Sequence, residues 1–265
     1  MKRATLAAGT SLAFLLAGCA SRPPPGMPSE PVPLSASDPL LTTLVEGWAD
    51  LVEARSSLRG GMVLKLSGPN GEQRLSQNLV LARPARIRME IQSFLMTAAV
   101  LVADENRYDY FQSGDRYREG GPVYPHLLWE IAGVPLTLEQ AVAFLLGAPP
   151  ARPGLAPSGG ERASDGTVRV DLHDARGGLA RKLWFGAEGQ LARAEEWSPS
   201  GQLLWQVAYD RYREVGERTF AHSIEFEFPP LASAATAAFR SVELNPHLPP
   251  GIFELQLADG EGGSP

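Results

Sequence analysis

Most of this sequence alternates apolar and polar residues with the two-residue period of a strand that buries one face. The pattern is cleanest where Ile87, Met89 and Ile91 alternate with arginine and glutamate. Similar runs recur from residue 62 to 110 and from 168 to 244, separated by glycine-containing turns. Consecutive strands joined by short turns pair antiparallel, and a long series of them buries one face most readily in a curved sheet. The sequence therefore predicts a mainly β (α+β) fold built on a single curved antiparallel sheet.

Three segments have helical periodicity instead. Apolar residues recur every three or four positions after Asp38, which is typical of an amphipathic helix with an aspartate N-cap. Two shorter helices are predicted at residues 126–131 and between Thr137 and Gly147. Residues 149–166 are rich in Pro, Gly, Ser and Ala and are predicted to form an exposed loop. We expect the helices to cover the concave face of the sheet.

The N-terminus has the layout of a secretory signal, with Lys2 and Arg3 before an uncharged apolar run. The run ends in Leu16-Ala17-Gly18-Cys19, and Cys19 is the only cysteine of the chain. This motif resembles the lipobox of bacterial lipoproteins, in which the cysteine is acylated and becomes the first residue of the mature chain. The alternatives are an ordinary cleaved signal peptide and a membrane helix, although the run is shorter than the ~20 residues that a span needs.

The lipobox resemblance sets the predicted division of the chain. Residues 1–18 are then the signal peptide, and residues 19–39 form a proline-rich tether behind the lipid on Cys19. Residues 40–257 form one domain, and residues 258–265 are a disordered tail. No aspartate follows the cysteine, which in such lipoproteins favours the outer membrane, so we expect a lipid-anchored protein that faces the periplasm.

Composition and motifs argue against several classes of function. The net charge of −6, without a block of like charge, argues against nucleic-acid binding. The four histidines are scattered, and no HExxH, CxxC, P-loop or G-x-S-x-G motif is present. We predict no metal, no cofactor other than the covalent lipid, no catalytic residue and a monomeric state. A hydrolase would need residues that come together only in space.

Apolar side chains are abundant on the predicted strands and on the helices between them. They either fill the core completely or line a cavity able to hold acyl chains. The candidate lining residues are Met62, Leu64, Leu66, Leu79, Ile87, Met89, Ile91, Val100, Val102, Leu128, Phe144 and Leu145. A second apolar group, Phe94, Leu95 and Met96, occupies a strand end where polar turn residues are expected. These three are either packed under a helix or exposed as a membrane-contacting tip.

Two stretches, together with the order of the lipobox and the leading amphipathic helix, resemble the LolA/LolB family of lipoprotein-localisation proteins. The strand Arg86-Ile87-Arg88-Met89-Glu90-Ile91 with Ser93-Phe94-Leu95-Met96 looks like a strand and protruding loop of that family. The segment from Leu128-Trp129 to Leu146-Gly147-Ala148-Pro149 is similar to its helical insertion. The resemblance implies an incomplete antiparallel barrel with a helical lid over an apolar cavity. It also implies that Leu95 contacts the bilayer and that a LolA-like periplasmic carrier is the partner.

The leading hypothesis is therefore an outer-membrane lipoprotein that takes lipoprotein acyl chains from a periplasmic carrier and releases them into the bilayer. A structural or assembly lipoprotein with a filled core, which uses the same fold to bind lipid or dock proteins, is the alternative.

Overall fold

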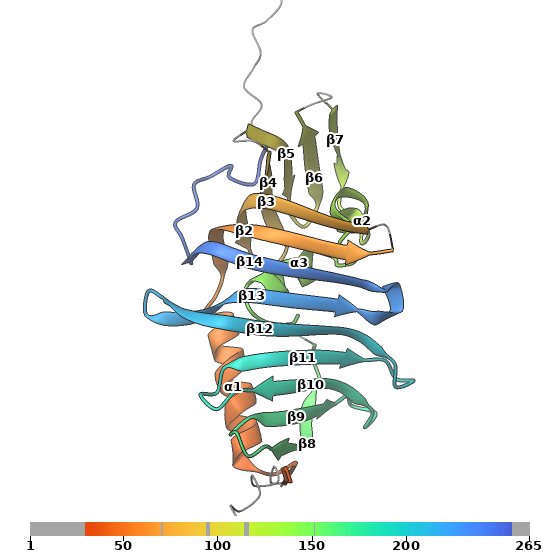
Figure 1. The fold of residues 1–265 in the computed structure, drawn as a ribbon, viewed down its shortest axis with the longest axis vertical. Coiled ribbons are helices and arrows are strands. Elements are labelled where there is room, and N and C mark those ends of the chain that lie inside the picture. The colour runs from red at the N-terminus through yellow and green to blue at the C-terminus, as the bar shows by residue number, and fades with distance from the viewer. Residues whose placement is uncertain (1–29, 70, 94–95, 114–116, 151, 256–265) are drawn as a thin grey trace, which may run out of the picture.

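The computed structural model describes residues 30–69, 71–93, 96–113, 117–150 and 152–255, and in these residues all 14 strands belong to one antiparallel sheet (Figure 1). Their spatial order is β1-β8-β9-β10-β11-β12-β13-β14-β2-β3-β4-β5-β6-β7. The strands are β1 (Val32–Ser35), β2 (Ser57–Gly68), β3 (Gly71–Ala82), β4 (Arg86–Ser93), β5 (Met96–Ala103), β6 (Arg107–Gln112), β7 (Tyr117–Pro122), β8 (Ala156–Arg162), β9 (Val168–His173), β10 (Leu179–Phe185), β11 (Leu191–Trp197), β12 (Leu203–Val215), β13 (Arg218–Phe228) and β14 (Ser233–Leu244).

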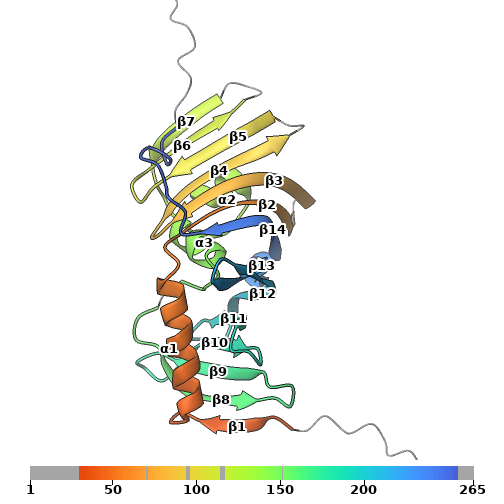
Figure 2. The same cartoon turned by 90° about the vertical axis from the view of Figure 1, so that its left-hand side faces the viewer.

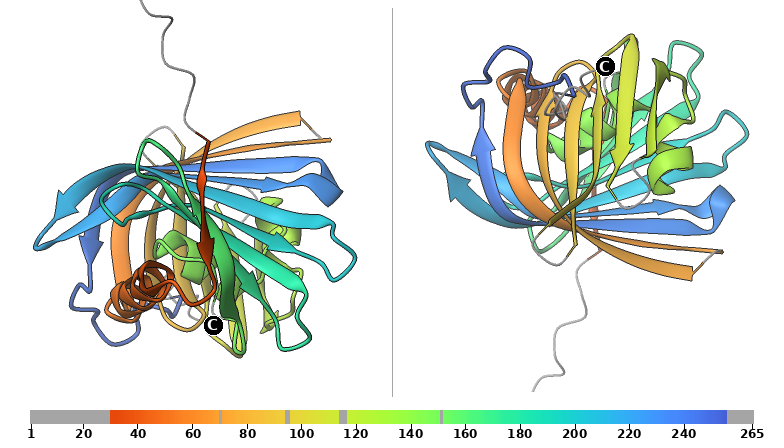
Figure 3. Two further views of the ribbon diagram at one scale, coloured as in Figure 1. Left: turned by 90° about the horizontal axis from the view of Figure 1, so that it is seen from below. Right: turned by 90° about the horizontal axis from the view of Figure 1, so that it is seen from above.

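The sheet curves strongly and does not close, so that β1 and β7 are its two edges within the described residues (Figures 2 and 3). Three α-helices accompany it in the same part of the chain, α1 (Pro39–Glu53), α2 (Leu127–Ala132) and α3 (Leu138–Leu145), with a 3₁₀ turn η1 (Pro229–Leu231) between β13 and β14. Helix α1 runs across β8 to β11, and α2 and α3 lie inside the curve of β2 to β5 (Figure 2). The predicted curved sheet with helices on its concave side is confirmed.

Helices α2 and α3 begin and end where their sequences predict. Helix α1 begins at its predicted N-cap but ends at Glu53, before the predicted end at Gly60-Gly61, which lies inside β2. The Asp38 carboxylate accepts a hydrogen bond from the Leu40 amide at 2.9 Å, and Pro39 occupies the first turn of α1. Thr137 and Gln140 form a reciprocal capping box at the start of α3. Gly133 ends α2 with a φ of 67°, a conformation that favours glycine. No helix among the described residues is long and apolar enough to cross a bilayer.

The prediction of an exposed loop over residues 149–166 was wrong, because strand β8 occupies residues 156–162. The strand contains Gly160, where an added Cβ would lie 2.1 Å from the Arg169 carbonyl oxygen of the neighbouring strand. The glycine that suggested a loop is therefore required for close approach of two strands.

The ordered domain also begins earlier than residue 40. Residues 32–35, which belong to the predicted tether, form the edge strand β1 and pair with β8. Pro33 is tolerated there because an edge strand has one row of backbone groups without strand partners. The Asp38 amide then bonds to the Ser35 carbonyl and turns the chain into α1.

Helix α3 and the turn after it lie in the centre of the molecule. Every residue from 141 to 149 is buried. The Phe144 ring meets the rings of Trp205 and Phe226 edge to face, with centroids 4.9 and 5.4 Å away. This segment joins the strands before the helical insertion to those after it through one continuous core.

Candidate functional site

Most of the residues predicted to line an acyl cavity lie together on the concave face, in the core between strands β2 to β4 and helices α2 and α3. They are Met62, Leu64, Leu79, Ile87, Met89, Leu128, Phe144 and Leu145. The β3–β4 register pairs Leu79 with Met89, and all eight side chains are buried. The structure thus assembles one apolar surface from five elements, and its role as an acyl-binding surface stays a prediction.

Burial decreases along this surface toward one end of the half-barrel. On β2, Leu58 is 0% exposed and Leu64 6%, while Leu66 is only half-buried. Ile91 is half-buried at the corresponding end of β4, which runs parallel to β2 because both pair with β3. We call this end, at the β2–β3 turn, the mouth.

Val100 and Val102 do not belong to this surface, contrary to the sequence-based prediction. The β4–β5 register pairs them with Glu90 and Arg88, whose side chains lie on the opposite face from Met89. Leu101 is the β5 residue that joins the concave core. The sequence does not show which face of β5 points inward, because β5 is apolar on both faces.

Side chains fill the interior of the half-barrel in this conformation. Phe144 is 1% exposed and Met62 2%. These two side chains are therefore in contact with other protein atoms over nearly their whole surface, as in a close-packed core. An acyl chain can reach this surface only if α2 and α3 move away from it.

An apolar groove of about 500 Å³ does open beside the helices at the mouth. Trp129 and Leu136 form one side of it, and Leu231 of η1 forms another. Trp129 is 41% exposed and Leu231 47%, and both are large apolar side chains. Trp129 also faces the β2–β3 turn across a second cavity of about 300 Å³. The groove is not evident from the sequence, because it forms between α2 and η1, which are far apart in the chain.

Arg55 binds the C-terminal end of α3, at the end of the half-barrel opposite the mouth. Its Nη1 donates to the Leu146 carbonyl at 3.3 Å and its Nη2 donates to the Thr219 carbonyl at 2.8 Å. The guanidinium also lies 5.3 Å from the centroid of the Phe220 ring. Gly147 makes this approach feasible, because an added Cβ there would lie 2.5 Å from Arg55 Nη1.

No carboxylate forms an ion pair with Arg55 among the described residues. Burial lowers the pKa of Arg55 to about 10. Burial also raises the pKa of its neighbour Tyr212 to about 12, so this hydroxyl is neutral at pH 7 and supplies no counter-charge. Arg55 is therefore a buried cation whose hydrogen bonds go to backbone carbonyls.

Replacing Arg55 with methionine is expected to loosen α3. The variant removes the hydrogen bonds to the Leu146 and Thr219 carbonyls, so the free energy of unfolding should fall by about 2–3 kcal/mol. Hydrogen exchange of residues 142–148 should become faster than in the native chain. Arg59→Met at a half-exposed arginine is the matched control and should change stability by about 1 kcal/mol or less. Unchanged exchange over residues 142–148 would contradict the assigned role of Arg55.

A polar side chain, Gln77, lies among the predicted cavity residues. It is on β3 between Met62 of β2 and Ile91 of β4, and its exposed fraction is 0%. Neither atom of its terminal amide has a hydrogen-bond partner within the described structure. The alternating pattern gave no indication of it, because a glutamine at an inward position looks like a break in the strand.

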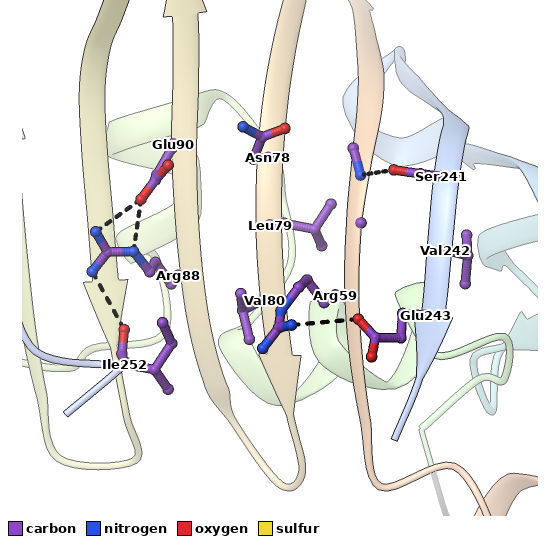
Figure 4. A pocket seen from close by; sticks show the side chains of 12 residues that line it. Arg59, Asn78, Leu79, Val80, Arg88, Glu90, Ser241, Val242, Glu243 and Ile252 are labelled. Carbon is purple, nitrogen blue, oxygen red and sulfur yellow. Dashed lines mark hydrogen bonds and ion pairs between the residues drawn. The ribbon is translucent and has the colours of Figure 1, made fainter. Parts of the chain in front are cut away.

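A separate pocket of about 450 Å³ lies on the other face of the sheet (Figure 4). Gly60 and Gly61 contribute to its lining, with Arg59 paired to Glu243 on one side and Arg88 on the other. Arg88 also donates to the carbonyl of Ile252, in the C-terminal segment after β14 that crosses this face. The charged groups in this pocket have partners within it.

The remaining predicted sites lie mostly outside the described residues. Cys19, Phe94 and Leu95 are not described, so the lipidation and membrane-contact predictions stay untested. Met96 is described at the start of β5 and is 72% exposed. No group of His, Cys, Asp or Glu that could hold a metal ion occurs within the described ranges.

No family model matches this sequence, and no curated protein matches it. Solved structures do match the fold. A DUF1329 family protein from Desulfovibrio piger superposes with a TM-score of 0.57 at 8% identity, covering 83% of this chain and 98% of that one. A LolA superfamily protein from Nitrosomonas europaea gives 0.54 at 14% identity, covering 80% and 96%. The fold is LolA-like.

A third match is a domain named as a candidate outer membrane lipoprotein-sorting protein from Vibrio parahaemolyticus. It has a TM-score of 0.53 at 10% identity and covers 81% of this chain and 95% of that one. At these identities the likeness concerns the fold alone. The architecture expected from the LolA/LolB resemblance is thereby supported, while LolB itself is not distinguished from its relatives.

Proposed function

We propose that this protein is a lipid-anchored component of the bacterial outer membrane that binds acyl chains on the concave face of its half-barrel. It receives lipoproteins from a LolA-like periplasmic carrier and inserts them into the outer membrane. The observation that carries the proposal is the apolar surface of β2 to β4, covered by α2 and α3 and adjoining an apolar groove at the mouth. The LolA-like fold supports it.

Transfer on this route needs no covalent chemistry. Apolar surface exposed to water is unfavourable by about 25 cal/mol per Å², so an acyl chain stays in apolar surroundings while it moves from carrier to receptor. The groove beside Trp129 and Leu231 offers the first contact, and displacement of α3 then exposes Phe144 and Leu145 to the chain. Trp129 lies on α2, which covers the same apolar surface and would have to move with α3.

A structural or docking lipoprotein with the same fold is the second candidate. The closed interior favours it, because buried side chains such as Phe144 already occupy the space that an acyl chain would take. The two candidates differ in whether ligand displaces α3 from the sheet.

The deciding experiment has two parts. Lipids that co-purify with the full-length chain are identified by mass spectrometry, and delivery is then measured from a carrier loaded with a radiolabelled lipoprotein to outer-membrane vesicles. Bound acyl lipids together with delivery support the receptor. A chain that binds no lipid and does not accelerate delivery would leave the docking function as the better account.

Leu95→Glu is expected to separate binding from delivery. A carboxylate at a bilayer-contacting tip opposes insertion, so delivery to vesicles should slow about tenfold or more while acyl binding is unchanged. Thr97→Glu, at an exposed position of β5 close to that tip, is the matched control and should slow delivery less. Delivery by Leu95→Glu at the native rate would remove the role assigned to this residue.

A further inference from the structure

We propose that Gln77 recognises the linkage by which an acyl chain is joined to the rest of its lipid, and that it prefers an amide to an ester. This inference rests on the proposed function, because it assigns a ligand group to the acyl-binding surface. It starts from the position of a single amide side chain in an otherwise apolar setting.

Among the described residues, the surroundings of Gln77 offer its side chain no hydrogen-bond partner. Across the sheet it pairs with Met62 and Ile91, and its neighbours on the same face of β3 are Leu75 and Leu79. All four are apolar. Neither the amide nitrogen nor the amide oxygen of Gln77 is reached by water in this conformation. An amide buried without hydrogen bonds destabilises the protein that contains it.

A leucine or methionine at this position would remove that penalty and match its surroundings. The glutamine instead lies on the concave face of β3, beside the core residue Met62, where the proposed ligand enters. Its nitrogen can donate to a carbonyl oxygen, and its oxygen can accept from an N–H. The linkage of an N-acyl chain has both a carbonyl and an N–H, whereas an ester has only the carbonyl.

The position along β3 fits such a linkage. Burial is nearly complete on the inner side of Gln77, at Leu79, and is partial on the mouth side, at Leu75. A chain inserted from the mouth would place its hydrocarbon against Leu79 and Ile87 and its linkage beside Gln77. The rest of the lipid would extend past Leu75 toward the opening.

The test compares the native full-length chain with Gln77→Met, which keeps the length of the side chain and removes both polar atoms. Gln202→Met is the matched control, at an exposed glutamine in the β11–β12 turn. Three probes of similar chain length are used, N-methyloctanamide, methyl octanoate and nonane, and each affinity is compared between variant and native chain. The urea midpoint of the ligand-free proteins is measured in parallel.

We expect Gln77→Met to weaken binding about tenfold for each hydrogen bond that the probe loses. The affinity for methyl octanoate should therefore fall about tenfold and the affinity for N-methyloctanamide about a hundredfold. The affinity for nonane should not change. The ligand-free variant should unfold at a higher urea concentration than the native chain. Gln202→Met should change none of these values.

A lower urea midpoint for Gln77→Met would overturn the inference, because it would show that the glutamine stabilises the ligand-free fold. Equal weakening of all three probes would also overturn it, and would leave acyl binding itself standing. If no probe binds the native chain, both the inference and the proposed function fail.

Discussion

Phe144→Ala is expected to lower the free energy of unfolding by about 3–5 kcal/mol, because it removes a fully buried ring from the centre of the half-barrel. The ring contacts Trp205 and Phe226, which belong to strands that follow the helical insertion in the chain. Urea unfolding followed by circular dichroism measures the loss. The vacated space should also bind a small apolar molecule such as benzene, since apolar cavities in proteins stay dry.

Leu204→Ala is the control for this measurement. Leu204 precedes Trp205 on β12 but is 38% exposed, and its truncation should change stability by about 0.5 kcal/mol or less. A loss below about 1 kcal/mol for Phe144→Ala would mean that α3 does not pack in the core as described. It would then favour a lid that already opens in the ligand-free protein.

Glu196→Gln is expected to destabilise the protein by about 3 kcal/mol through an uncompensated buried charge. The Glu196 carboxylate accepts from Arg181 Nε at 2.7 Å, and the two side chains are only 10% and 5% exposed. Arg152 pairs with the same carboxylate, and Arg181 also donates to the Pro150 carbonyl at 2.9 Å. The network fixes the segment after α3 to the inner face of β10 and β11.

Two comparisons separate charge from packing in this result. The double variant Arg181→Met/Glu196→Leu should recover most of the loss, because apolar side chains of similar size often replace a buried ion pair without penalty. Glu243→Gln breaks the exposed pair with Arg59 and should change stability by about 1 kcal/mol or less. Equal losses for Glu196→Gln and Glu243→Gln would contradict the assigned role of the network.

The sequence predicted correctly those elements that depend on interactions between residues close together in the chain. The alternation of Ile87, Met89 and Ile91 identified β4. The capping residues Asp38 and Thr137 and the terminal Gly133 marked the ends of helices, because their side chains or backbone angles satisfy hydrogen bonds within a few residues.

Features that depend on distant partners could not be predicted in this way. Strand β8 was missed because the glycine at position 160 is required by the close approach of β9, which its neighbours in the chain do not reveal. Val100 and Val102 were assigned to the wrong face because register, and not composition, decides the orientation of β5. Arg55 and Gln77 were missed because their importance lies in partners, or the lack of them, that only the fold reveals.

The order of the strands has a consequence for how the chain is made. β14 pairs with β2, so Ala234 lies beside Ser67, and this seam joins two series of consecutive hairpins. During vectorial synthesis, the hairpins of each series can form locally, but the seam forms only once β14 is available. Such a late, long-range closure is slow compared with hairpin formation. Newly synthesised molecules should therefore pass through a stage with two free sheet edges at the seam, which chaperones could bind.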